Sequence, residues 1–505
     1  MEPFARSTSA WTSIMVQPYK RGDPAALSRL RALMQSIMVR NRPEAIGNDV
    51  QLPPLHEKAV VLPPTHHQAL TYNTAIAFFH INAILTERVG RDYFFHADNK
   101  KHLRQIVDNL FQACFWFSIS LNHIQDGIVN GLHALELWEQ GNKPYSDDDV
   151  SLLRKCIAEL QRAANDPEWA YIVQADSVGY WVKGLPPRLA TSLFCSPPKP
   201  DIATDTNDTA KLATLPQLRD GLVSVKRMLA TADDDLPPSS ANVSPSEFEQ
   251  LRSAKVVGCT SSKVAYLIEQ LLYYHQHEKC IVFASSQSEV IIVGDALRLA
   301  RVPHLVYANQ VMSQSQRRHN ITTFATSTMY NVIVMDVVLA AYGIDLSAAS
   351  RVWFISPIWQ AARERQAIKR AHRLGQQRPV FVETLITGES IEEALWRRRQ
   401  ELSDCDSEPV AKDVEEDGKM RSMLSNASFI QRSSIGSLES DFPLLPPGAR
   451  YPQLLRHKYQ LWSPDSPNQV SSKVPFYKAR RLSLRLASPN KADPPDKQLD
   501  ALPLT

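Results

Sequence analysis

Short apolar runs rich in β-branched and aromatic residues alternate with amphipathic helical patterns across residues 259–403. A run that is apolar at every position is typical of a strand whose two faces are both buried. The alternation of such strands with helices predicts an α/β fold, in which helices wrap a parallel sheet. The expected strands are CIVFA, HLVYA, NVIVM, RVWFI and VFVETLI, and the expected helices lie near 263–277, 288–300, 314–325, 361–373 and 390–402.

The first half of the chain is expected to be mainly helical. Apolar residues recur at helical spacing between Ala25 and Val39, over 71–89 and within 102–138. Ser146, followed by three aspartates, predicts the N-cap and acidic first turn of the helix VSLLRKCIAELQRAA. Between the first two helices, the proline-punctuated stretch QLPPLHEKAVVLPP favours an extended, strand-like segment.

Two segments contain too few apolar residues to build a core. One is the acidic, proline- and serine-rich stretch TADDDLPPSSANVSPS, and the other begins near residue 404. Such compositions predict disorder. The expected organisation is therefore an N-terminal segment at 1–70, a helical region at 71–230, a disordered linker at 231–258, an α/β lobe at 259–403 and a disordered tail at 404–505.

The overall composition disfavours several classes of protein. The formal net charge of the 505 residues is only +3, so any basic surface must be local. The six cysteines are scattered and include no CxxC pair, so neither a metal site nor a disulfide framework is predicted. The longest apolar stretch, around Val332 to Tyr342, is interrupted by Asp336, so no membrane partner is expected.

The stretch from Ala340 to Leu395 carries the most specific motifs. It contains AAYGIDL at 340–346, then ISPIW ending at Trp359, and then QAIKRAHRLGQ at 366–376. This series closely resembles the C-terminal helicase lobe of the Swi/Snf-type chromatin-remodelling ATPases of helicase superfamily two, which implies a RecA-like fold. The upstream stretches KCIVFASSQSEV and SQSQRRHNITTF support the resemblance.

The resemblance implies roles for eight residues. In phosphoryl transfer the protein mainly places positive charge on the developing phosphate charge. Two arginines three residues apart on the expected helix 361–373 would face the same side and could both reach a cleft. By spacing alone they could equally belong to a solvated basic helix face. The implied residues are Arg370 and Arg373 as arginine fingers, Gln366, Gly343 and Asp345 at the nucleotide, and Ser285, Arg317 and Ser347 at the nucleic-acid backbone.

The N-terminal segment resembles the same family. LMQSIMVRNRPEAI, QLPPLHEKAVVL and Gln68 are similar to the segment that leaves the first RecA-like lobe and braces the two lobes. The resemblance implies that 1–70 is a remnant of this exit and brace segment. It also implies that 71–230 is an insertion between the lobes, enlarged in this chain.

The motifs that would hold the ATP phosphates do not occur in the sequence. A complete motor needs a GxxxxGK[ST] loop for the phosphates and an acidic box for magnesium. We therefore expect the N-terminal ATP-binding lobe to be absent, Mg²⁺ to be held by that lobe, and the chain alone to be inactive. The family's usual Ser-Thr pair is replaced by Asp336 and Val337, two glycines by Ala340 and Ala341, and an asparagine by Asp345. An ionised carboxylate repels phosphate, which disfavours DNA contact through Asp336.

Three functions are compatible with this pattern. The first is the second motor lobe of a nuclear DNA-dependent ATPase or chromatin-remodelling translocase, either as a fragment of a longer gene product or as a truncated copy. Its cofactors would be ATP and Mg²⁺, its partner would be double-stranded DNA or chromatin, and a further protein partner could supply the first lobe. The second is a non-catalytic scaffold or interaction protein derived from a truncated remodeller. The third is a nucleic-acid-binding protein that uses the basic helix without ATP, and whose affinity would fall steeply with salt.

Overall fold

The computed structural model describes residues 8–37, 52–184, 211–214, 255–308, 312–341, 343–404, 413–431 and 439–443. The chain divides into two units, of which the first is Met1–Pro53 with Leu374–Gln377 and the second is Pro54–Arg373 with Arg378–Thr505. The described helices of the first unit are α2 (Thr8–Trp11), the π-helical segment η1 (Thr12–Val16), α3 (Gln17–Lys20) and α4 (Pro24–Ile37). Helix α4 is the one expected between Ala25 and Val39.

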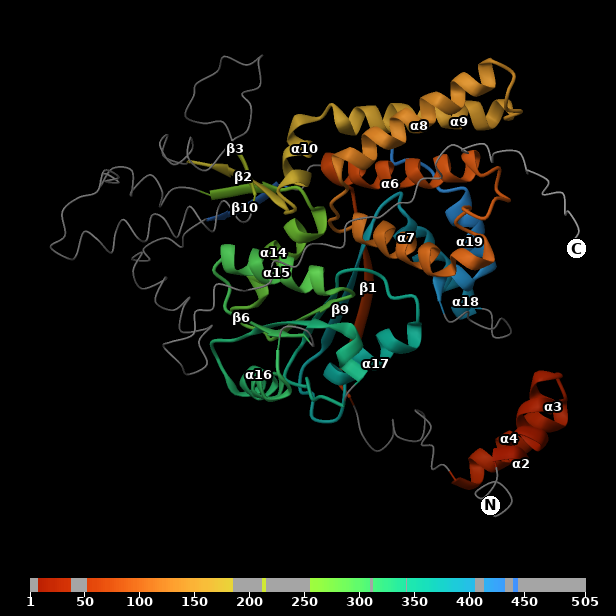
Figure 1. Cartoon of the computed structure of the whole chain (residues 1–505). Coiled ribbons are helices and arrows are strands. Elements are labelled where there is room, and N and C mark those ends of the chain that lie inside the picture. The colour runs from red at the N-terminus through yellow and green to blue at the C-terminus, as the bar shows by residue number, and fades with distance from the viewer. Residues whose placement is uncertain are drawn as a thin grey trace, which may run out of the picture. The chain divides into compact units, whose positions relative to one another are not determined.

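A six-stranded parallel sheet forms the α/β lobe of the second unit (Figure 1). In chain order its strands are β1 (Leu55–Leu62), β5 (Cys280–Ala284), β6 (His304–Tyr307), β7 (Val332–Asp336), β8 (Arg351–Phe354) and β9 (Val380–Thr387). Their spatial order is β1-β9-β8-β5-β7-β6, and every neighbouring pair is parallel. The expected RecA-like α/β fold is confirmed, with the strand-like stretch before the helical region as its sixth strand.

Helices cover both faces of this sheet. They are α14 (Ser262–Tyr274), α15 (Gln287–Leu299), α16 (Gln314–Thr326) and α17 (Ala361–Ala371). Since successive strand residues point to opposite faces, Val282 packs in the core cluster that contains α14 and α15, and Phe283 packs in the cluster that contains α16 and α17. Figure 1 shows the two pairs of helices on opposite sides of the sheet. Burial on both faces explains why the strands are apolar at nearly every position.

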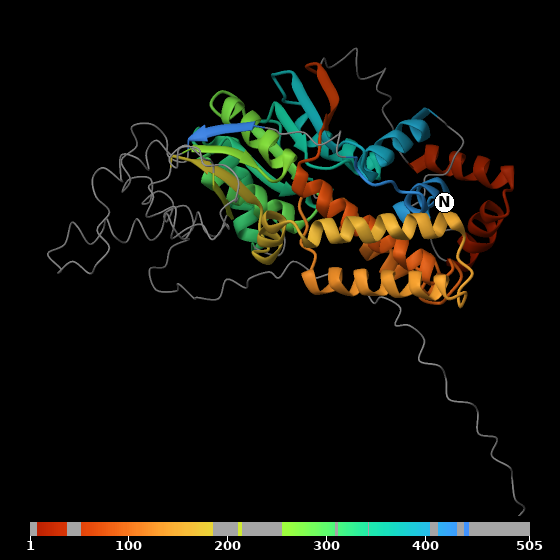
Figure 2. The same cartoon turned by 90° about the horizontal axis from the view of Figure 1, so that it is seen from above.

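A separate core of helices adjoins the lobe. Its helices are α6 (His66–Leu85), α7 (Lys100–Ala113), α8 (Leu121–Glu139), α9 (Asp147–Ala164), α10 (Pro167–Gln174), α18 (Ile391–Asp404) and α19 (Gly418–Ser425). Helix α6 is buried along almost its whole length, as expected for a helix that is apolar on all sides. Helices α8 and α9 lie side by side (Figure 2). Ser146 caps α9 as predicted, by accepting a hydrogen bond of 3.1 Å from the Asp149 N–H.

A small antiparallel sheet was not predicted. Its order is β10 (Glu439–Pro443), β4 (Lys255–Cys259), β2 (Gly179–Lys183) and β3 (Lys211–Thr214). Strand β4 begins within 231–258, so the expectation of a disordered linker is wrong for its last residues. Alternate side chains of β2, Tyr180 and Val182, are buried with Val256 of β4, and this apolar face stabilises the pairing.

Part of the expected tail belongs to the helical core. Residues 413–431 form the 3-10 helix η4 (Val414–Glu416), α19 and a following segment, and Met420, Leu424 and Ile430 are buried. Asp417 caps α19 by accepting a hydrogen bond of 2.8 Å from the Met420 N–H. A few apolar residues are enough to order this segment, because they pack on a core that other helices have already formed. The disordered tail predicted from 404 is therefore wrong for these residues, and most of the linker and tail lies outside the described residues.

Asp149 of α9 is expected to stabilise the contact of this helix with the turn that follows α6 in a pH-dependent way. Two hydrogen bonds from Arg88, of 2.6 and 3.2 Å, reach its carboxylate and lower its pKa. Because the folded-state pKa is lowered, this contribution is complete above the pKa of an unfolded aspartate, about 4. This contribution is lost as the pH falls further, through the pKa of Asp149 in the folded state. Asp149→Asn should thus cost up to about 1 kcal/mol at neutral pH and progressively less in acid. Urea unfolding across this range measures the cost, and a cost independent of pH would contradict the ion pair.

Candidate functional site

The two candidate arginines lie at the C-terminal end of α17. Arg370 is on the last turn of the helix, which ends at Ala371. His372 has left the helix, with φ −92° and ψ 84°, although its N–H still donates to the Ile368 carbonyl at 2.8 Å. Arg373 is therefore beyond the helix, and the expectation that both arginines project from one helix was wrong. The position of Arg373 relative to Arg370 is therefore set by the non-helical backbone at His372, and not by helical spacing.

The turn that contains Gly343 packs against this end of α17. Gly343 has a φ of +67°, the left-handed region that glycine adopts at little cost, which is the backbone conformation that the expected tight turn requires. The Leu346 N–H donates to the Arg370 carbonyl at 3.1 Å. In return, the Arg370 Nε–H donates to the carbonyl of Ala340 at 2.9 Å. These two hydrogen bonds fix the turn on the helix end.

Asp345 lies beside Arg373. One carboxylate oxygen of Asp345 is 3.8 Å from an Arg373 guanidinium nitrogen, and it also accepts a hydrogen bond of 3.0 Å from the Ser347 N–H. The Ser347 N–H and, to a smaller extent, Arg373 lower the pKa of Asp345, so the carboxylate is ionised at neutral pH. The Arg373 side chain is 41% exposed and that of Asp345 63% exposed, so a solvent-borne anion can reach the guanidinium.

The structure brings together only some of the candidate residues. Gln366 is exposed on α17, one turn before Arg370 and on the same face. Ser347 is partly buried in the turn with Asp345. Ser285 is exposed just after β5, where its N–H donates to Glu289 at 2.6 Å, and Arg317 is partly buried on α16. Ser285 and Arg317 thus come from elements other than the turn and α17.

Asp336 ends β7 with a partly buried carboxylate. One of its oxygens accepts a hydrogen bond of 2.9 Å from the Val338 N–H. Burial raises the pKa of this carboxyl group, and the hydrogen bond opposes that rise. A side chain that the sequence identifies as a departure from its family is therefore anchored in place at the end of a central strand.

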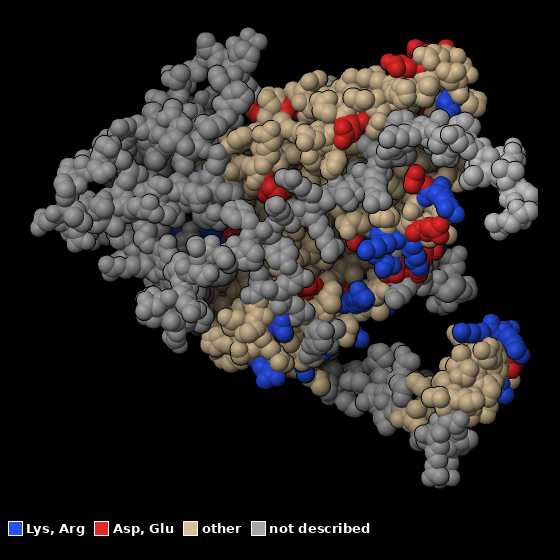
Figure 3. All heavy atoms as spheres, in the orientation of Figure 1, with Lys and Arg blue, Asp and Glu red and all other residues tan. Residues whose placement is uncertain are grey.

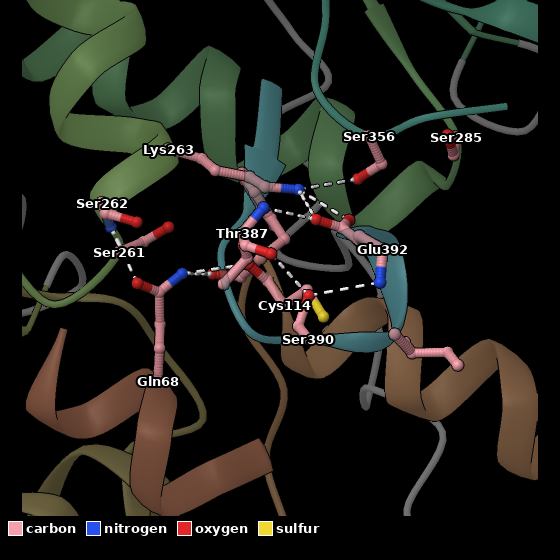
Figure 4. Close-up of polar contacts among 12 residues, drawn as sticks. Gln68, Cys114, Ser261, Ser262, Lys263, Ser285, Ser356, Thr387, Ser390 and Glu392 are labelled. Carbon is pink, nitrogen blue, oxygen red and sulfur yellow. Dashed lines mark hydrogen bonds and ion pairs between the residues drawn. The ribbon is translucent and has the colours of Figure 1, made fainter. Parts of the chain in front are cut away.

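A buried ion pair joins α14 of the lobe to α18 of the helical core (Figure 4). The Lys263 ammonium is 2.6 Å from both carboxylate oxygens of Glu392 and 3.2 Å from the Ser356 hydroxyl. Both charged side chains are 0% exposed. Glu392 also accepts a hydrogen bond of 2.9 Å from the Thr387 N–H. Sequence analysis missed this pair, because each residue lies in the first turn of an amphipathic helix, where a charge is normally solvated.

Gln68 connects the helical core with the lobe in the same region (Figure 4). Its side-chain carbonyl accepts a hydrogen bond of 3.0 Å from the Ser262 N–H, and its amide donates to the Cys114 carbonyl at 3.0 Å. The Thr387 hydroxyl donates to the same carbonyl at 2.8 Å. Polar groups at the ends of α7, α14 and β9 are thereby satisfied inside the protein, as buried polar groups generally are.

Two other features, a metal-binding cluster and a membrane-spanning helix, are absent from the part of the chain that the structure describes. There, no group of three or more His, Cys, Asp or Glu side chains is placed to hold a metal ion. Within the same residues, no helix is long and apolar enough to span a membrane. Arg and Lys side chains lie on the surface over α16 and α17 (Figure 3), where Arg318, Arg363, Arg365 and Lys369 are exposed.

Two family models match the chain. The helicase conserved C-terminal domain matches residues 262–375, and the SNF2-related domain matches residues 1–114. The chain is 24% identical over 404 residues to the DNA repair protein RAD5B of Arabidopsis thaliana, covering 76% of this chain and 29% of that protein. It is 26% identical over 423 residues to a putative SWI/SNF-related matrix-associated actin-dependent regulator of chromatin, subfamily A member 3-like 1, of the same plant, covering 81% and 42%.

Among solved structures, the chain is similar to the C-terminal part of the Fun30 ATPase domain, with a TM-score of 0.39 and 16% identity, covering 74% of this chain and 97% of that one. It spans less than half the length of the curated relatives it matches. Both family models and these relatives relate the chain to the Snf2-type proteins of helicase superfamily two. The SNF2-related match covers the segment 1–70, and the domain boundaries given above remain predictions.

Proposed function

We propose that this chain is the second motor lobe of a DNA-dependent ATPase of the Snf2 kind, in which Arg370 and Arg373 contact the phosphates of an ATP held by another lobe. The observation that supports this most directly is the turn at 343–347, which is hydrogen-bonded to the end of α17 and leaves the Arg373 guanidinium accessible. A preorganised positive charge of this kind stabilises the charge that develops during phosphoryl transfer.

The residues present fit ATP in part. The guanidinium groups can contact phosphate oxygens, and Gln366 is exposed on the same face of α17. The described residues offer no acidic cluster for a metal ion, and the sequence has no GxxxxGK[ST] loop. Mg²⁺ and the phosphate cradle are therefore proposed to come from a first lobe, as in Snf2-type ATPases generally.

Double-stranded DNA is the proposed partner. Ser285, Arg317 and Ser347 would contact its backbone, and the exposed basic residues over α16 and α17 would add a salt-dependent attraction (Figure 3). Proteins similar to this chain are named as DNA repair proteins and as a chromatin regulator. A nuclear location and a role on DNA or chromatin are therefore proposed for this chain as well.

Steady-state ATP hydrolysis tests the proposal. The chain is assayed alone, with double-stranded DNA, and with a Snf2-type first lobe that carries the phosphate loop. We expect turnover only when the first lobe is present, and we expect DNA to stimulate it. Turnover by the chain alone would contradict the view that the phosphates are held elsewhere. DNA binding without turnover in any combination would favour the nucleic-acid-binding function, and the loss of both would favour the scaffold.

Asp336→Ser is expected to raise the affinity for double-stranded DNA several-fold. The substitution removes a negative charge from the carboxyl end of β7 and restores a hydroxyl that can donate to a phosphate. Serine can also keep the hydrogen bond from the Val338 N–H. Fluorescence anisotropy measures the change, with Asp98→Ser as the control because Asp98 is an exposed acid of the helical region. Unchanged affinity in both variants would show that the end of β7 does not approach DNA.

A further inference from the structure

The ion pair between Asp345 and Arg373 is not needed to hold the turn in place. The turn is already fixed by the hydrogen bonds between Leu346, Arg370 and Ala340. The side chains of Asp345 and Arg373 are 63% and 41% exposed, and their closest charged atoms are 3.8 Å apart. Exposed pairs of this kind contribute little to folding stability. The Asp345 carboxylate therefore has its main effect on Arg373, the candidate arginine beside it.

The Asp345 carboxylate is well fixed although it is exposed. The Ser347 N–H binds the same oxygen that lies near Arg373, and this hydrogen bond orients the side chain without burying it. The backbone is bent into this arrangement by Gly343, whose φ of +67° starts the turn. Asparagine at this position could accept the same hydrogen bond, but it would carry no charge to attract the guanidinium. The negative charge is thus the property of Asp345 that distinguishes it.

We propose that Asp345 is a positioning residue that occupies the Arg373 guanidinium when no phosphate is present, and that an incoming phosphate has to displace it. This inference rests on the proposed function, because it names a regulator of the same arginine. A phosphate carries more charge than a carboxylate and can bind a guanidinium with two hydrogen bonds. The exchange therefore favours the phosphate. However, binding phosphate at Arg373 requires a higher phosphate concentration than binding it at an arginine without a carboxylate partner.

The reactivity of Arg373 toward phenylglyoxal tests the inference in the intact chain. The reagent modifies accessible guanidinium groups, and peptide mass spectrometry reports the rate at each arginine. In Asp345→Asn we expect Arg373 to react roughly two- to five-fold faster than in the wild type, the range that the loss of an exposed ion pair gives. Glu393→Gln is the matched control, because Glu393 forms an exposed pair of 2.5 Å with Arg397. It should accelerate Arg397 and leave Arg373 unchanged.

Inorganic triphosphate provides the second arm of the test. It should protect Arg373 from the reagent in both proteins, at a several-fold lower concentration in Asp345→Asn than in the wild type. Equal rates at Arg373, an equal acceleration of all arginines, or equal protecting concentrations would each overturn the inference. These readouts need neither a first lobe nor turnover. A faster Arg373 together with no ATP hydrolysis in any combination would therefore support the role of Asp345 and count against the proposed function.

Discussion

Lys263→Met is expected to lower the free energy of unfolding by about 3–5 kcal/mol. The substitution leaves the Glu392 carboxylate fully buried without its counter-charge, while the Thr387 N–H still holds it in place. An isolated buried charge is much more costly than the loss of one hydrogen bond, because the low-dielectric interior does not solvate it. Urea denaturation followed by circular dichroism measures the change.

Two further variants separate the burial of charge from the loss of the lysine itself. In Lys263→Met combined with Glu392→Leu, apolar side chains replace both charges, and most of the stability should return. Lys58→Met is the matched surface control, since Lys58 pairs with Glu383 at 2.9 Å but is 63% exposed, and it should cost less than about 1 kcal/mol. A single Lys263 variant as stable as the wild type would show that Glu392 is neutralised or solvated in another way.

Arg373→Ala is expected to lower ATP turnover by roughly 10³-fold or more when the chain is assayed with a first lobe and DNA. The proposed contact is stronger with the developing phosphate charge than with bound ATP, so the turnover number should fall more than the affinity for ATP. Arg373 lies beyond the end of α17 and its side chain is 41% exposed, so the urea midpoint should change little. Steady-state kinetics and urea denaturation of the same preparation measure the two quantities.

Arg370→Ala provides the comparison. The Arg370 Nε–H donates to the Ala340 carbonyl, so this variant should lose turnover and also loosen the turn, which lowers the urea midpoint. Arg397→Ala, on the exposed face of α18, should change neither quantity. Turnover that survives Arg373→Ala would show that this residue does not belong to the proposed site, although the chain would still act as part of an ATPase.

Local sequence patterns predicted the strands of the lobe well. The residues of β5 are apolar at every position because both faces of the strand are covered, and this signal depends only on the strand itself. The hydrophobic pattern predicted the start of α6 at residue 71, which is too late. Thr65 and Gln68 form a capping box, and their spacing in the sequence THHQ is the signal for the true helix start. The pairing of β1 with β9 was not predicted, since no local pattern specifies a partner strand so distant in the sequence.

The site was predicted less completely than the fold. The motif at 366–376 identified the arginines, but helical spacing placed Arg373 on α17, and the backbone at His372 ends the helix first. The contact between Asp345 and Arg373 depends on how the turn docks, which residue spacing does not encode. The Lys263–Glu392 pair depends on two helix starts meeting inside the protein. Sequence patterns show which residues have side chains that could bind a ligand or form an ion pair. Tertiary packing determines which of these side chains come into contact.

The parallel pairing of β1 with β9 also affects how the chain can be synthesised and folded. Leu55 pairs with Val380, so the ribosome makes β1 long before β9, its neighbour in this sheet. At typical rates of translation, the interval is roughly a quarter of a minute to a minute. The helices between them can pack during that time, while β1 keeps an unpaired hydrogen-bonding edge. The lobe therefore cannot be completed until β9 has been made, and nascent chains stalled before β9 should be the ones that depend most on chaperones.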